Sequence, residues 1–301
     1  MWCRPTFLLL LSLAAVPVNG ISLTTAAPPA LTAVTAAGEA VPELRVAPAT
    51  PRQGQALFVS TAGIAAAEPV TMTWDGKRYA IYSLGGGWRG VIPLQIEERP
   101  GKHTLRVTYR DSSGAARSLQ RTVTVGRTPL RIQRLKMSRT TEKLYSYPGR
   151  AQELATVRRA LRMQTPQQLW NGDFRLPSRG RFSTPFGVKR IRNGRHVGYH
   201  RGLDIAAPTG TPIHAAATGR VVLARSLKMH GKTVVIDHGL GVTSLYIHQS
   251  ALRCREGQSV RRGDLIGEVG MTGTATGPHL HWSIYVHSTA VSPLFWTKLP
   301  R

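Results

Sequence analysis

Acidic residues are scarce in this chain. Its 301 residues include 15 Asp and Glu against 40 Lys and Arg, a formal net charge of +25. Such a surface favours polyanionic partners through long-range attraction and counterion release. Nucleic acid, anionic cell-wall polymers and lipid headgroups all have that chemistry. A bias in Arg usage that serves solubility or reflects lineage explains the charge equally well.

Cysteine is almost missing as well, with Cys3 and Cys254 as the two examples. Cys3 lies inside an N-terminal segment that resembles a secretory signal, too early for a lipid-attachment site. Removal of that segment leaves Cys254 alone, so we expect no intrachain disulfide. Cys254 itself fits a small buried residue.

Long apolar runs are limited to the N-terminus. A short segment with Arg4 precedes an apolar run from Phe7 to Val18, and small or polar residues follow around Asn19. That order is typical of a secretory signal over residues 1–20. The run is shorter than the roughly 20 residues that span a bilayer, so an uncleaved anchor is the less favoured alternative. No later stretch predicts a transmembrane helix. We therefore expect export to the periplasm or cell envelope, with release from the cell left open, and nucleic acid is disfavoured as a partner.

Composition divides the remaining chain into four segments. Residues 21–42, rich in Ala, Thr and Pro, predict a linker. Residues 43–127 hold short β-type runs between turn residues, which predict an immunoglobulin-like β-sandwich with Trp74 and Trp88 in its core. Residues 128–179 predict a basic connector with a helix over 149–164. Residues 180–301 predict a second, β-rich domain.

Two motifs in this last domain have metal-ligand character, and nine of the ten histidines lie between positions 196 and 287. In the first motif, His200, Gly202 and Asp204 share a face if the segment is extended, because side chains alternate along a strand. Gly202 leaves room where a side chain would crowd an ion. In the second, His279 and His281 share a face, and their apolar neighbours point the other way.

This donor set suits catalytic zinc. Two imidazoles and one carboxylate can hold Zn²⁺ and leave a fourth position for water. One histidine of the His279–His281 pair is then spare, and His248, after a predicted strand, supplies another. Spare histidines beside a zinc site can move protons during peptide hydrolysis.

Together these motifs resemble the lysostaphin-like (LytM-domain) zinc metallopeptidases. The similarity covers residues 182–295, more than a third of the chain. The matching segments run in family order: Thr184 to Gly187, His200 to Ala206, Gly210 to Ile213, Ala217 to Val222, Val235 to Gly239, Leu245 to His248, Gly270 to Gly273, Gly277 to Trp282 and Val291 to Pro293.

The resemblance implies a role for each motif residue. His200, Asp204 and His281 correspond to the zinc ligands, and His248 and His279 to the catalytic pair, whose division of labour stays open. It also implies an antiparallel β-sheet crossed by a groove, and peptidoglycan stems or cross-bridges as the substrate of a zinc endopeptidase. Which bond is cut stays open.

Two other functions compete with this one. Some relatives have lost ligands and activate other wall hydrolases, so a non-catalytic peptidoglycan-binding protein or activator is the alternative. The occupation of all five positions favours an active enzyme. A scaffold that binds anionic envelope polymers through the sandwich and basic connector is compatible with either.

Overall fold

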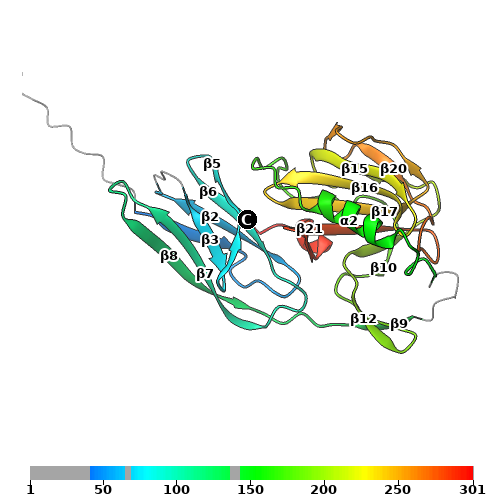
Figure 1. Ribbon diagram of the computed structural model, residues 1–301, viewed down its shortest axis with the longest axis horizontal. Helices are drawn as coiled ribbons and strands as arrows, with labels where there is room; N and C mark the ends of the chain where they lie inside the picture. Colours follow the sequence, from blue (N-terminus) through cyan, green and yellow to red (C-terminus); the bar gives the residue numbers. More distant parts are fainter. Residues whose placement is uncertain (1–40, 65–68, 136–142, 301) are drawn as a thin grey trace, which may run out of the picture. The chain divides into compact units, whose positions relative to one another are not determined.

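The computed structural model describes residues 41–64, 69–135 and 143–300 (Figure 1). Cys3, the predicted signal peptide and residues 21–40 of the predicted linker lie outside this part of the chain. The structure is mainly β, as predicted. Within the described residues, no helix is both long and apolar enough to cross a membrane.

The N-terminal region contains two four-stranded antiparallel sheets around one core. In sheet order, the first consists of β1 (Glu43–Ala47), β2 (Ala56–Ala62), β6 (Gly87–Pro93) and β5 (Ile81–Leu84), and the second of β4 (Lys77–Tyr79), β3 (Thr71–Trp74), β7 (Gly101–Arg110) and β8 (Ala116–Val125). Alternate residues of β7 are buried, the pattern of a strand with one face on a core. Trp74 and Trp88 lie in that core. The sandwich is therefore present, and its immunoglobulin-like type stays a prediction.

The C-terminal region is built on one large antiparallel sheet. Its strands, in order, are β10 (Arg181–Thr184), β13 (Leu203–Ala206), β21 (His279–Val286), β17 (Val242–Gln249), β16 (Gly231–Gly239), β15 (Gly219–Leu227) and β19 (Ser259–Val260), and β22 (Thr289–Val291) pairs with β21. β16 and β17 form an antiparallel hairpin. Its turn places Leu240 at φ 51° beside Gly241.

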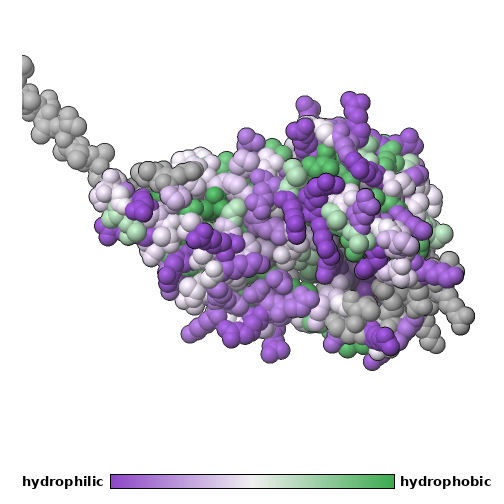
Figure 2. Space-filling model, in the orientation of Figure 1, coloured by the Kyte–Doolittle hydropathy of each residue, from purple (hydrophilic) through white to green (hydrophobic). Residues whose placement is uncertain are grey.

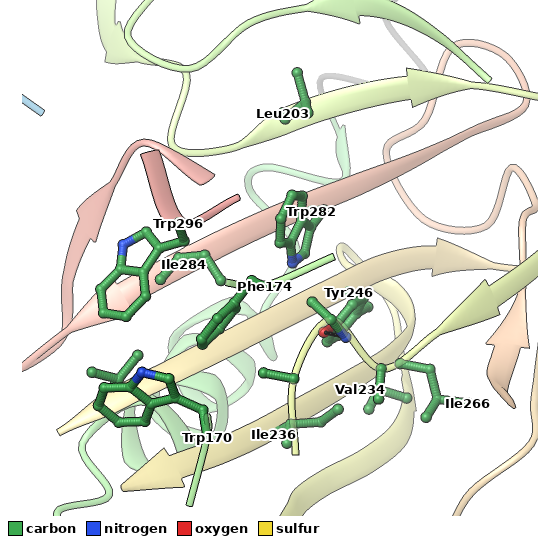
Figure 3. Packing of buried hydrophobic residues seen from close by; sticks show 14 of the residues in the cluster. Trp170, Phe174, Leu203, Val234, Ile236, Tyr246, Ile266, Trp282, Ile284 and Trp296 are labelled. Atoms are coloured by element: carbon green, nitrogen blue, oxygen red, sulfur yellow. Dashed lines mark hydrogen bonds between the residues drawn. The ribbon is translucent and has the colours of Figure 1, made fainter. Parts of the chain in front are cut away.

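Both faces of this sheet carry apolar side chains. One face packs into the core shown in Figure 3, where Trp282 and Tyr246 are fully buried beside Phe174. On the opposite face lies α2 (Arg150–Leu161), as Figure 1 shows. Its residues Val157, Ala160 and Leu161 join a second cluster with side chains from β15, β16, β17 and β21. The helix thus covers part of the face on which the two motifs with metal-ligand character lie.

The connector is more ordered than its sequence predicted. β9 (Ile132–Leu135) pairs in parallel with β11 (Lys189–Arg192), which forms a hairpin with β12 (Arg195–Tyr199). The predicted helix is present but shorter than 149–164, since α2 begins at Arg150 and ends at Leu161. The remaining elements are a three-stranded sheet of β14 (Pro212–His214), β20 (Leu265–Glu268) and β18 (Ala251–Leu252), and the short helix α3 (Pro293–Trp296). Cys254 is only half-buried, less than expected.

Candidate active site

His200, Asp204 and His281 converge at the surface of the C-terminal sheet. Asp204 on β13 is directly opposite His281 on β21 in the strand register. Oδ1 of Asp204 lies 2.7 Å from Nδ1 of His281 and 3.0 Å from Nε2 of His200. One ligand atom from each residue lies within 4.8 Å of the others. The structure therefore brings together the three residues that the sequence nominated as ligands.

Local backbone geometry explains this convergence. Leu203 and Ile205 enter the core, so Asp204 between them faces the opposite side of the sheet. His200 reaches the site from a loop, because β13 begins only at Leu203 and the predicted extended segment is shorter than expected. Gly202 permits the close approach of the strands: a Cβ atom there would lie 2.4 Å from Oγ of Ser283.

Hydrogen bonds fix the orientation of both imidazoles. Nδ1 of His200 donates to the carbonyl of Pro185 at 2.8 Å, and Oγ of Ser283 lies 2.8 Å from Nε2 of His281. The unshared pairs of the opposite nitrogens then point at the Asp204 carboxylate. Two imidazole nitrogens and one carboxylate oxygen aimed at one point form a donor set that fits Zn²⁺.

The electrostatics favour the metal-binding protonation states. Burial lowers the pKa of His281 to about 4, so its imidazole is neutral at pH 7. Burial by itself raises the pKa of Asp204, but the polar contacts with His200 and His281 outweigh it and hold that pKa far below its usual value. Nη2 of Arg190 also lies 3.4 Å from Oδ2 of Asp204. Neutral histidine and ionised carboxylate are the forms that bind metal.

His248 and His279 lie beside this group. Their ring centroids are 4.9 Å apart, and the centroid of His248 is 6.3 Å from that of His281. Nδ1–H of His248 donates to the backbone carbonyl of Thr272, and Nδ1–H of His279 donates to that of Gly277, each at 2.8 Å. Their Nε2 atoms are thereby left as proton acceptors. The His279 side chain is 17% exposed, so the site opens to solvent.

The residues that orient these rings were not assigned roles from the sequence. Ser283 could have been found, because it lies two positions after His281 on the same strand face. Pro185, Thr272 and Gly277 act through backbone carbonyls, which leave no signature in side-chain chemistry.

His238 is structural. Its ring is fully buried, with Nδ1 bonded to the carbonyl of Thr218 and Nε2 2.7 Å from Oγ of Ser244. Burial lowers its pKa to about 4. With both nitrogens engaged, the ring has no access to the metal group.

A second group of possible ligands, Asp75, Glu98 and His103, lies in the sandwich. Nδ1 of His103 is 2.6 Å from Oδ2 of Asp75, and Nε2 is 2.6 Å from the carbonyl of Arg99. Both ring nitrogens are therefore within hydrogen-bond distance of acceptors of the protein itself, and we assign this group no metal.

Comparisons with known proteins concentrate on the C-terminal region. Residues 198–293 match the family model described as Peptidase family M23. DD-carboxypeptidase/endopeptidase Mpg of Neisseria meningitidis serogroup B is 41% identical over 114 residues, which cover 38% of this chain and 26% of that protein. Peptidoglycan DD-endopeptidase ShyA of Vibrio cholerae is 38% identical over 120 residues, which cover 40% and 28%. The chain thus spans about a quarter of the length of these relatives.

A solved structure extends the likeness beyond that region. An M23 peptidase from Pseudomonas aeruginosa aligns over 83% of this chain and 96% of its own, with 29% identity and a TM-score of 0.59. That coverage requires the sandwich as well as the large sheet. Through its C-terminal region, the chain belongs to peptidase family M23.

Proposed function

We propose that this protein is an exported zinc metalloendopeptidase that hydrolyses peptide bonds in the stems or cross-bridges of peptidoglycan. The observation that carries the proposal is the convergence of His200, Asp204 and His281, with His248 and His279 beside them. Relatives named as peptidoglycan DD-endopeptidases support the substrate class. Export rests on residues 1–20, outside the described part of the chain.

His200, Asp204 and His281 would hold the zinc ion. When bound, zinc acidifies water and polarises a carbonyl group, the two effects that peptide hydrolysis needs. Asp204 supplies the negative charge of the ligand set. The carbonyl of Pro185 holds His200 in the tautomer that leaves its ligand nitrogen unprotonated, and the hydroxyl of Ser283 can accept Nε2–H of His281 in the corresponding tautomer.

His248 and His279 would handle protons. The carbonyls of Thr272 and Gly277 fix the Nδ1 protons, so Nε2 of either ring can accept a proton from the attacking water. The same proton can then pass to the nitrogen of the departing amine, which completes cleavage of the C–N bond. Burial and the neighbouring imidazoles lower the pKa of His248 to about 3, so that ring is neutral at pH 7.

The test is digestion of purified peptidoglycan with the zinc-loaded protein, followed by mass spectrometry of the released fragments. We expect new amine termini at one type of peptide bond, and none with a His281→Ala protein. Walls of two cross-link chemistries would identify the bond. Wall binding by the zinc-loaded protein without fragment release would instead support the binding-protein alternative.

A further inference from the structure

Helix α2 carries a buried acid that the proposed chemistry does not use. Glu153 is 6% exposed. Its carboxylate accepts backbone N–H bonds from Lys228 at 2.9 Å, Met229 at 3.0 Å and His230 at 2.9 Å. Nδ1 of His230 lies 2.6 Å away, and the hydroxyl of Tyr147 donates to the same group. One carboxylate thus holds an entire turn between β15 and β16.

The same turn supports the strand end that carries His248. The carbonyl of His230 accepts the backbone N–H of His248 at 3.1 Å. The carbonyl of Met229 accepts the N–H of Thr274 at 2.9 Å, in the loop whose Thr272 carbonyl receives Nδ1–H of His248. Both the backbone and the ring of His248 therefore depend on this turn.

His248 needs such support because its backbone is strained. Its φ is +66°, in the left-handed region that a non-glycine residue rarely adopts. A conformation of this kind is energetically unfavourable and persists only where the surroundings impose it.

We propose that Glu153 is a positioning residue for His248, acting through the turn of Lys228 to His230 to hold the ring beside His279 with Nδ1 hydrogen-bonded to the carbonyl of Thr272. The inference rests on the proposed catalytic role of His248. Glu153 lies outside residues 198–293, so a helix of the connector completes the catalytic site.

Glu153 is separable from the docking of its helix. The apolar residues Val157, Ala160 and Leu161 fasten α2 to the sheet independently of the carboxylate. Replacement of Glu153 by Gln keeps this surface and nearly all of the side-chain volume. It removes the negative charge and directs an amide NH₂ at backbone N–H groups. Helix α2 should therefore stay in place while the turn of Lys228 to His230 loses its hydrogen bonds to the carboxylate.

The experiment compares Glu153→Gln with the wild type, with zinc loaded, on a soluble cross-linked muropeptide. We expect kcat to fall about 10-fold or more, within the roughly 10²-fold cost of misplacing a catalytic group by about 1 Å. KM should change less than about 2-fold and zinc content should stay the same, because no ligand is touched. Long-range ¹H–¹⁵N spectra of the His248 ring should change from one Nδ1–H tautomer to a mixture.

Two further variants complete the design. Tyr147→Phe removes one donor to Glu153 and should give a smaller fall in kcat with a smaller spectral change in the same direction. Glu256→Gln makes the same chemical change in an exposed ion pair with Arg225. It should leave both kcat and the spectra of the His248 ring unchanged.

Unchanged kcat and unchanged His248 signals in Glu153→Gln would overturn the proposal. So would a fall in kcat that merely parallels a loss of folded or zinc-loaded protein. If Glu153→Gln does not fold, Tyr147→Phe decides: wild-type kcat with wild-type ring signals refutes positioning. An inactive wild type, or an active His248→Ala protein, would instead refute the proposed function, and the ring spectra would still test the positioning itself.

Discussion

Nε2 of His200 and Nδ1 of His281 lie 3.0 Å apart although 81 positions separate the two residues in the chain. Two imidazole nitrogens at that distance, both unprotonated, repel each other unless a cation lies between them. The Asp204 carboxylate beside both completes a negatively charged set of donors.

We therefore expect about one zinc ion per chain and its loss in His200→Ala and His281→Ala proteins. Each substitution removes one of three protein ligands. Metal analysis after dialysis measures the change. His214→Ala, a histidine whose Nδ1 bonds the carbonyl of Gly263, is the control and should keep its zinc. Full occupancy in both ligand variants would refute the assignment.

His248→Ala and His279→Ala should retain zinc and lose turnover by about 10²- to 10⁴-fold, the usual size of general acid–base help. Neither ring belongs to the metal group, yet both stand beside it. Fragment release per unit of zinc is the measurement. Near-normal release by one variant would remove that histidine from the mechanism.

Gly202→Ala should damage the metal site without touching a ligand. The added Cβ would lie 2.5 Å from the carbonyl of Trp282 and 2.7 Å from Nε2 of His281. Overpacking of this kind costs typically 1–3 kcal/mol. We expect lower zinc content and a lower unfolding temperature. Gly126→Ala, whose Cβ would meet nothing closer than 3.4 Å, is the control. If Gly202→Ala had the zinc content and unfolding temperature of the wild type, the strands would be able to shift enough to accommodate the added Cβ atom.

A low pH should weaken the hydrogen bonds through which the Glu153 carboxylate holds the turn of Lys228 to His230. Burial by itself raises the pKa of Glu153, but hydrogen bonds from Tyr147, His230 and Met229 lower it from 4.5 to about 2. A carboxylate whose pKa is lower in the folded protein stabilises the fold at pH values above its unfolded-state pKa. That stabilisation is lost as the pH falls toward the folded-state pKa. The contribution is at most on the order of 3 kcal/mol.

Urea unfolding of zinc-free wild type and Glu153→Gln checks this between pH 7 and pH 2. The difference in free energy of unfolding should be constant above about pH 5 and should shrink as the pH falls below 4.5. A pH-independent difference would mean that the pKa of Glu153 is the same in the folded and unfolded states.

Wall binding should be electrostatic and separable from cutting. The formal net charge is +25, and long hydrophilic side chains cover much of the face in Figure 2. Exposed charges are screened over about 8 Å at physiological ionic strength, so sedimentation with walls should weaken as salt rises, even for His281→Ala. Walls stripped of anionic polymers are the control. Binding indifferent to salt would point to specific contacts from the sandwich instead.

The local pattern of the sequence determined much of this protein. Leu280 and Trp282 are fully buried while His279 and His281 face the other side, as the period of two along a strand required. Local patterns likewise predicted a helix within residues 149–164 and the burial of Trp74 in the sandwich core. These features depend on residues close together in the chain, so short-range sterics and apolar burial specify them.

Only the tertiary structure decided which distant groups meet. The register that sets Asp204 opposite His281 depends on strand pairing across some 75 residues, and many pairings satisfy the same alternation. The ring tautomers depend on the backbone carbonyls of Pro185, Thr272 and Gly277. Because every residue has such a carbonyl, the residue type does not indicate that it accepts a hydrogen bond from a histidine. Glu153 had no role assigned from the sequence, and only the fold buries its carboxylate against the backbone N–H groups of Lys228, Met229 and His230.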